Sequence, residues 1–353
     1  MNRLQRIEHT RTELLAQPGA IGATLAIARA AAVDIVSAWR QRKIQQVYFV
    51  GSGDSLIVGE AVAPAWQRWV ERPAIPMQAL EFARYGVHCA DDATAVVIIS
   101  ASGRSEATLE SLRSAMRRGA LTLAVTNTET APLISEATHH LLVSATRVGW
   151  PTQSSTAPIA ALLWLGLVWS AKLDSVDAHA VLTLPETVQD VLEAHDIPMR
   201  ALAEKWRDRA TFFFAGGGPA YAAARMGAAK IKEMSQDHAH AMFLEEYHHY
   251  YSVKSGEAFF LVAPNGVLRD RAVSTARSAA SEGASLVILR SEDEAGYEGL
   301  SGHQVALPPI PESLASVVYA VPLQLFAQHL AILKQQPEWA QQDHQGRRVR
   351  SPQ

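Results

Sequence analysis

Cysteine is almost absent from this chain of 353 residues, which contains only Cys89. A single cysteine excludes a disulfide within the chain and is typical of proteins that work in a reducing compartment. The N-terminal residues are too polar for a secretory signal, and no apolar run reaches the roughly 18 residues of a membrane span. We therefore expect a cytoplasmic protein that does not bind membranes.

The chain also lacks the charge and the motifs of several protein classes. Its net charge of −3 gives no basic surface for nucleic acid, so we expect no nucleic-acid partner. The phosphate-binding pattern GxxxxGK[ST] is missing, which argues against a nucleotide-dependent kinase. The segment GSGDSL is not the GxGxxG of dinucleotide-binding proteins, so no nucleotide cofactor is expected.

What the chain does contain is an internal repeat. Residues 47–62 and 211–226 each read as an apolar strand, a glycine turn and a helix of small residues. Their continuations, residues 95–127 and 258–290, also match each other. The repeat predicts two α/β domains, residues 1–175 with the N-terminal helices and residues 176–353 with the C-terminal tail. Each domain is expected to be a doubly wound parallel sheet flanked by helices.

Hydrophobic patterning places the elements of these domains. The apolar run 95–100 has no alternation, as expected for a parallel strand that is covered on both faces. Residues 161–171 are predicted to lie in a buried helix, and residues 173–186 to form a linker. The remaining predictions are strands at 47–50, 122–127 and 139–145 and helices at 1–42, 56–70, 105–118, 157–173 and 186–207.

Hydroxyl groups distinguish the two copies. The first copy carries serines at two strand ends, and the second has glycine, alanine and asparagine there. Helix N-termini with glycine turns and hydroxyls bind phosphate, and the carboxyl ends of parallel strands share one edge of a sheet. The alternative is that the serines are ordinary helix caps. The predicted anion site comprises Ser52, Gly53, Ser55, Ser100, Ser102 and Ser105.

These segments resemble the tandem sugar isomerase (SIS) domain family. The chain is similar to the isomerase half of glucosamine-6-phosphate synthase, and to fructosamine-phosphate deglycases and amino-sugar-phosphate deaminase/isomerases. The resemblance runs through GSGDS, SASGRSE and GWPTQSST, and its most specific segments are KIKEMSQDHAHA and VVYAVPLQLFAQHLAILK. It implies two SIS domains, a phosphorylated sugar as substrate and no cofactor or metal.

The resemblance also assigns substrate contacts. It implies that Ser55, Ser100, Ser102 and Ser105 bind phosphate. Arg104 stands where the family has glutamate, and it would give a charge-assisted contact to an anion. Thr152 stands where a sugar-contacting serine is usual.

Three further residues are implied to act in catalysis. Glu233 matches the family's acid/base, and His249 matches the histidine that opens the sugar ring. The sequence EEYHHYY departs from the family pattern, so His248 is an alternative to His249. Arg347 aligns near a lysine that forms an imine in the synthase, and an arginine would instead neutralise an enediolate.

The sequence therefore predicts an isomerase, deaminase or deglycase acting on a 6-phosphorylated amino sugar or fructosamine. The alternative is a sensor that binds a sugar phosphate without turning it over. The histidine-rich stretch 238–249 lacks metal-ligand spacing, so no metal is expected. Related proteins are dimers that share the active site between subunits, which predicts a homodimer. The apolar helix at 161–171 and eight tryptophans give weak support for it.

Overall fold

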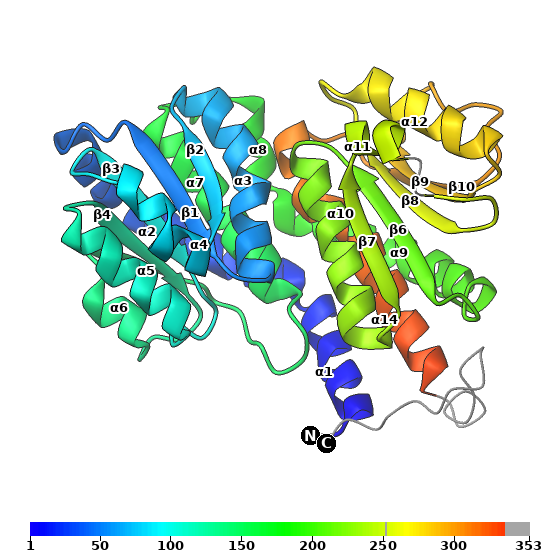
Figure 1. Cartoon of the computed structure of the whole chain (residues 1–353), viewed down its shortest axis with the longest axis horizontal. Helices are drawn as coiled ribbons and strands as arrows, with labels where there is room; N and C mark the ends of the chain where they lie inside the picture. The colour runs from blue at the N-terminus through cyan, green and yellow to red at the C-terminus, as the bar shows by residue number, and fades with distance from the viewer. Residues whose placement is uncertain (251–252, 336–353) are drawn as a thin grey trace.

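The protein has two lobes, each built around a five-stranded parallel sheet (Figure 1). The computed structural model describes residues 1–250 and 253–335. In the first sheet the strands are β1 (Gln46–Gly51), β2 (Ala74–Gln78), β3 (Thr94–Ile99), β4 (Leu121–Thr126) and β5 (His139–Leu142). In the second they are β6 (Thr211–Gly216), β7 (His238–Phe243), β8 (Ala258–Ala263), β9 (Ser285–Ser291) and β10 (His303–Leu307).

The two sheets have the same strand order. The first runs β2-β1-β3-β4-β5, and the second, taken from its other end, runs β7-β6-β8-β9-β10. All pairs are parallel, and every residue of β3 and of β8 is buried, as the unbroken apolar run predicted. The expected α/β class with parallel sheets is confirmed.

Helices cover both faces of both sheets. The first lobe carries α3 (Asp54–Val70), which follows the glycine turn, and α7 (Gln153–Trp169), whose residues 153–167 are all buried. The corresponding helix after the turn of the second lobe is α10 (Pro219–Lys230), which continues into a single π-helical turn, η2 (Ile231–Ser235). The other elements are α1 (Arg3–Leu15), α2 (Gln17–Gln41), α4 (Ala79–Arg84), η1 (Gly86–Cys89), α5 (Glu106–Arg117), α6 (Pro132–Glu136), α8 (Val176–Leu182), α9 (Leu184–Lys205), α11 (Leu244–Tyr250), α12 (Arg269–Ser281), η3 (Glu312–Leu314), α13 (Ala315–Val318) and α14 (Ala320–Lys334).

The predicted linker at 173–186 is helical, so that prediction is wrong. Ser175 caps α8 by accepting a hydrogen bond from the Ala178 backbone nitrogen, and Ala178 and Val181 are buried. The stretch is rich in polar residues, but the cap and one apolar stripe are enough to fold it against the first lobe.

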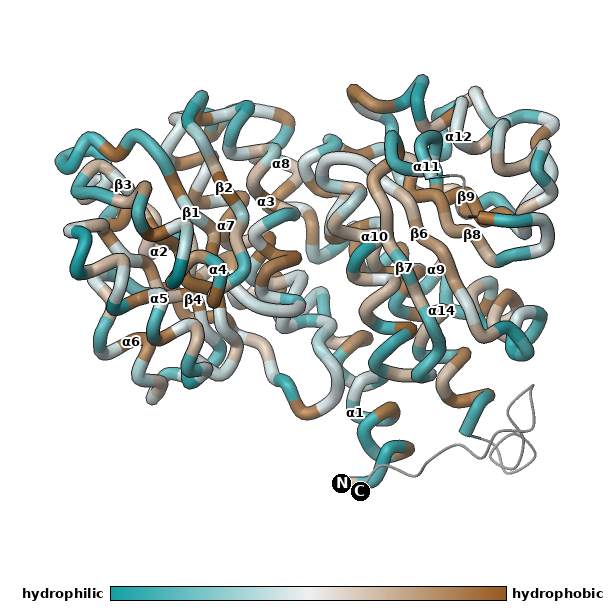
Figure 2. Tube along the Cα trace, in the orientation of Figure 1, coloured by the Kyte–Doolittle hydropathy of each residue, from teal (hydrophilic) through white to brown (hydrophobic). Residues whose placement is uncertain are grey.

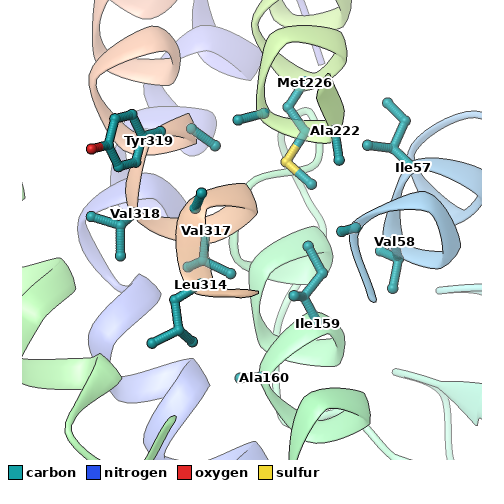
Figure 3. Packing of buried hydrophobic residues seen from close by; sticks show 14 of the residues in the cluster. Ile57, Val58, Ile159, Ala160, Ala222, Met226, Leu314, Val317, Val318 and Tyr319 are labelled. Carbon is teal, nitrogen blue, oxygen red and sulfur yellow. The ribbon is translucent and has the colours of Figure 1, made fainter. Parts of the chain in front are cut away.

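The largest hydrophobic cluster crosses from one lobe to the other. Figure 3 shows Ile57 and Val58 of α3 facing Ala222 and Met226 of α10, with Leu314 and Val317 packed beside them. The tube in Figure 2 is brown along the strands and teal over much of the outer surface. Helices α3 and α10 pack directly against each other, so the two lobes form one continuous core.

Two segments have the length and mean hydropathy of a membrane span, residues 17–41 and 312–334. Of the most apolar window in each, 44% and 83% respectively is buried inside the protein, so the second segment is mostly covered, as a core helix is. Helix α7 is buried within its own chain, as are Trp39, Trp66 and four further tryptophans. The apolar helix and these six tryptophans therefore fill the core, and they no longer support a subunit interface.

Candidate active site

The two glycine turns have nearly the same backbone. Gly53 has φ +58° and ψ −128°, and Gly218 has φ +54° and ψ −133°, a region that glycine favours. At Gly51 a Cβ would lie 2.6 Å from the Ser55 backbone, and at Gly216 a Cβ would lie 2.5 Å from that of Ala220. Glycine at the strand end therefore lets each helix start tightly against its strand, which places the backbone N–H groups of the helix start at the sheet edge.

A cleft of about 510 Å³ opens beside the first of these turns, between the lobes. The first lobe contributes the turn and the start of α7, and the second contributes the end of α10, η2 and β7. Residues far apart in the chain therefore form one site. The lining residues are Ser52, Gly53, Asp54, Ser55, Ile57, Ala101, Arg147, Pro151, Ser154, Ser155, Arg225, Ala228, Ala229, Lys232, Glu233, Ala239, His240 and Ala241.

A buried lysine joins two carboxylates at this cleft. Lys230 is fully buried, and its Nζ donates to Asp54 Oδ2 at 2.8 Å and to Glu233 Oε2 at 2.6 Å. Ser155 Oγ also donates to Asp54 Oδ2, at 2.9 Å. Asp54 belongs to α3 and Glu233 to η2, so the ammonium group connects the two lobes where they meet at the cleft.

The titration of this cluster follows from its burial. Burial raises the pKa of Glu233 above its ordinary value, although the neighbouring Lys230 ammonium opposes the rise. Burial alone would lower the pKa of Lys230, but the carboxylates of Asp54 and Glu233 raise it overall. Lys230 therefore stays protonated, while Glu233 gains and loses its proton closer to neutral pH than an exposed glutamate does.

The π-helical turn positions Glu233. Such turns are rare and occur often at functional sites. Here the backbone carbonyl groups of Glu233 and Met234 accept hydrogen bonds from the Arg3 side chain of α1. The N-terminal helix therefore helps to hold the turn from which Glu233 reaches the cleft.

Of the residues predicted from sequence, Ser52, Gly53, Ser55 and Glu233 line the cleft. The second serine loop contributes only Ala101. Within that loop Ser100 Oγ accepts a hydrogen bond from the Gly103 backbone nitrogen, and Ser102 Oγ accepts one from Arg104. The guanidinium of Arg104 donates to the Thr130 backbone oxygen at 3.1 Å, and Ser105 is the N-cap residue of α5.

Other predicted residues lie away from the cleft or outside the described residues. Thr152 is buried before α7, and its hydroxyl has no hydrogen-bond partner among residues 1–250 and 253–335. His249 lies on α11 with 64% of its side chain exposed, 3.6 Å from Glu245. His248 bonds Thr275 of α12 at 2.9 Å, which turns it away from the cleft. Arg347 lies outside the described residues.

Sequence reasoning missed most of the charge in the cleft. Lys230, which is not among the residues predicted for the site, is fully buried. Arg225 of α10 pairs with Glu60 of α3, while Arg147 and Lys232 form no ion pair within the described part of the chain. The i,i+3 spacing of Lys230 and Glu233 was a signal that could have identified their contact.

His240 of β7 is a further lining residue of the cleft. Neighbouring residues of a strand point to opposite faces, and Ala239 packs in the core beneath α10. The ring of His240 stacks on Phe213 with 5.8 Å between ring centroids. Among the described residues no group of three or more histidine, cysteine or acidic side chains could hold a metal ion.

Comparison with known proteins places this geometry in a family. Residues 41–167 match the SIS domain family. The chain is therefore a SIS-domain protein. It is homologous to the isomerase domain of glucosamine-fructose-6-phosphate aminotransferase, as the resemblance predicted.

One curated relative is the glutamine–fructose-6-phosphate aminotransferase (isomerizing) of Thermococcus kodakarensis. It is 31% identical over 301 residues, which cover 82% of this chain and 49% of the relative. The chain thus spans about half the length of the curated relatives it matches.

Two solved structures show the same fold. The C-terminal domain of glucosamine-fructose-6-phosphate aminotransferase from Francisella tularensis superposes with a TM-score of 0.82 at 24% identity, covering 92% of this chain and 96% of that one. Glucosamine-6-phosphate deaminase from Thermotoga maritima gives 0.71 at 18% identity, covering 95% of both chains.

Proposed function

We propose that this protein is an enzyme that processes a phosphorylated amino sugar or fructosamine, by aldose–ketose isomerisation, deamination or deglycation. The reaction would pass through an enediol or enediolamine. The observation that carries the proposal is the pairing of Glu233 with the buried Lys230 at the cleft that the turn of Ser52, Gly53 and Ser55 also lines. The names of the relatives and structural neighbours agree with this class of reaction.

The turn supplies the phosphate site in this proposal. Helix α3 begins there, so its free N–H groups and the hydroxyls of Ser52 and Ser55 suit an anion. Arg147 and Lys232 add positive charge to the same cleft. Ser100, Ser102, Arg104, Ser105 and Thr152 are retained as candidate binding residues that would act after movement of their loops.

Glu233 would move the proton between adjacent carbons of the open-chain sugar. The raised pKa of this carboxyl suits the task, because a general acid/base works best when its pKa lies near the working pH. His249 would open the ring from a neighbouring subunit, which its exposed place on α11 allows. Arg347 remains the candidate for neutralising the enediolate.

Glu233→Gln tests the proposal. Wild-type protein is incubated with fructosamine 6-phosphate, glucosamine 6-phosphate, galactosamine 6-phosphate and hexose 6-phosphates, and products are followed by mass spectrometry and ammonia release. We expect Glu233→Gln to lower turnover by about 10²–10⁴-fold, the usual worth of a general acid/base. Glu136→Gln, which breaks an ion pair with Arg113 on the outer surface of the first lobe, is the matched control and should leave turnover unchanged.

The alternative function is a sugar-phosphate sensor. The position of His249 outside the cleft of its own chain is the observation that favours it. A sensor would show ligand-induced thermal stabilisation without turnover of any sugar in the panel. That result, with equal stabilisation of Glu233→Gln, would contradict the enzyme proposal.

We further propose that the protein is a cytoplasmic homodimer with two SIS domains, residues 1–175 and 176–353. The equal strand order of the two sheets supports the second domain. Sedimentation at micromolar concentration should give the mass of two chains. A mass near 38.3 kDa, that of one chain, would contradict the dimer. It would also contradict the proposed role of His249, which requires the active site of a neighbouring subunit.

A further inference from the structure

The buried cluster at the cleft contains two carboxylates, and the proposed function uses only one of them. Asp54 lines the cleft together with Glu233, and 12% of its side chain is exposed. Both carboxylates bond the same nitrogen, Lys230 Nζ, so their bonded oxygens each lie within one hydrogen-bond length of a common atom. The two acids therefore stand side by side in the lining of the cleft.

Each carboxylate keeps one oxygen for another partner. Asp54 uses Oδ2 for both Lys230 and Ser155, and Glu233 uses Oε2 for Lys230. Neither Asp54 Oδ1 nor Glu233 Oε1 makes a hydrogen bond to any residue within 1–250 and 253–335. Two carboxylate oxygens are thus available to a bound substrate.

Lys230 cannot serve the substrate in the same way. It is fully buried, and two carboxylates hold its ammonium group. An ammonium group has no lone pair to accept a proton, and the two short charge-assisted bonds fix its position. Lys230 therefore acts as a shared counter-ion, and proton transfer falls to the acids.

Isomerisation requires two proton movements. One proton passes between adjacent carbons, and another passes between the oxygens that those carbons carry. A single carboxylate that faces the carbons serves the first movement, and a second group near the oxygens serves the other.

We propose that Asp54 is a second catalytic residue, which carries the proton between the two oxygens of the enediol while Glu233 carries the proton between the carbons. This inference rests on the proposed function. From a ketose, Glu233 takes a C1 proton, the C–H electron pair becomes the C1=C2 bond, and the C2=O π pair moves to the C2 oxygen to give an enediolate. The Asp54 carboxylate then takes the C1 hydroxyl proton and passes it to the C2 oxygen. The O–H electron pair becomes the C1=O bond and the C1=C2 pair takes the proton back from Glu233 at C2, which gives the aldose and restores both carboxylates.

The variant Asp54→Asn separates the proton transfer between the carbons from the proton transfer between the oxygens. The amide of Asn keeps a hydrogen-bond donor toward the carbonyl oxygen and an acceptor toward Lys230, but it cannot relay a proton. With fructose 6-phosphate or tagatose 6-phosphate in D₂O, whichever ketose the wild type converts faster, mass spectrometry measures deuterium entry at C1 and aldose formation. We expect deuterium entry within tenfold of wild type and aldose formation lowered by at least 100-fold.

The outcomes are distinguishable. Parallel loss of both rates, or no loss of aldose formation, would overturn the role of Asp54. Wild-type protein that shows neither deuterium entry nor conversion of any sugar would instead overturn the proposed function. If Asp54→Asn does not fold, Asp54→Ser carries the same test, since its hydroxyl can still bond Lys230. Asp270→Asn, which breaks an exposed pair with Arg269 on α12, is the matched control and should keep both rates.

Discussion

The two glycine turns share a backbone and differ in chemistry. Gly53 and Gly218 have nearly equal dihedral angles, and each opens a helix at the edge of a sheet with the same strand order. Around Gly53 the neighbours are Ser52, Asp54 and Ser55, while Gly218 is flanked by glycine and proline. The conformation of the turn is therefore not sufficient to form a binding site. The side chains around the turn determine whether it can bind a ligand.

The two helices that pack against each other between the lobes, α3 and α10, also differ in their side chains. Pairing the turns aligns α3 with α10, so Ala65 corresponds to Lys230 and Arg68 to Glu233. Each cleft takes one wall from the opposite helix, and a second cleft of about 580 Å³ beside Gly218 is lined by Ala65 and Arg68. The same helix positions thus hold a buried lysine and an acid beside the first cleft, and alanine and arginine beside the second.

The ion pair of Glu60 and Arg225 lies where the two helices meet. These residues occupy corresponding positions of α3 and α10, and they bind each other between the lobes. One symmetric position has thus acquired opposite charges, which fixes the helices together. The difference in charge between the two copies therefore also stabilises the contact between the lobes.

Lys230→Met is expected to give the largest change in stability. It leaves Asp54 and Glu233 partly buried without their counter-ion, and breaking such a cluster costs about 3–5 kcal/mol. Without the ammonium, the pKa of Glu233 rises further, so the loss should be greater at pH 8 than at pH 5. Urea unfolding at both pH values measures it, with the exposed Lys232→Met as control.

An equal loss at both pH values in that experiment would mean that the lysine acts by filling space. The two clefts would then differ at this position in packing rather than in charge. The corresponding position in α3 holds only the methyl group of Ala65.

Gly53→Ala and Gly218→Ala test whether the turns differ only in their side chains. A Cβ would meet no atom within 4 Å at either position, so the cost arises from the positive φ alone, about 1–3 kcal/mol each. We expect similar losses in thermal unfolding for the two variants. Turnover should fall only in Gly53→Ala, and a comparable fall in Gly218→Ala would show that the second cleft takes part in the reaction.

The fold could be predicted from the sequence because most strands and helices have a clear local pattern of apolar residues. Unbroken apolar runs marked β3, and the small-residue helices after each glycine turn appeared as α3 and α10. The polar stretch at α8 failed because only one apolar stripe and one cap reveal that helix. Predictions were good wherever strand and helix periodicity extended over a full element.

The site was harder to predict because it forms between the lobes. The predicted residues Ser55 and Glu233 both line the cleft. The contact between Asp54 and Lys230 joins residues 176 positions apart, and no local sequence pattern indicates it. The second serine loop looked equivalent to the first, yet hydrogen bonds to Gly103 and to the Thr130 carbonyl hold its side chains elsewhere. Contacts between residues far apart in the sequence, and hydrogen bonds within a loop, therefore could not be predicted from the sequence.

Asp196→Asn is expected to give the smallest effect, away from both clefts. Asp196 of α9 binds Arg11 of α1 at 2.6 Å and His329 of α14 at 2.8 Å, so it fastens the N-terminal helix to the second lobe. Chiefly because of the hydrogen bond from Arg11, the pKa of Asp196 falls from 3.8 to about 2. Since 32% of the Asp196 side chain is exposed, solvent screens the pair and we expect a loss of about 1 kcal/mol at pH 7.

The sign of the pH dependence follows from the lowered pKa of Asp196. Its stabilisation is present above the unfolded value of 3.8 and disappears as pH falls through about 2. Urea unfolding of wild type and Asp196→Asn should therefore differ most at pH 7, differ less at pH 3 and converge as pH falls through about 2. Glu204→Gln on the same helix, in an exposed pair with Arg200, should differ from wild type by no more than about 0.5 kcal/mol at pH 7. A gap for Asp196→Asn that persists unchanged at pH 3 would show that shape rather than charge fastens α1, and that the two lobes would keep their contact without this ion pair.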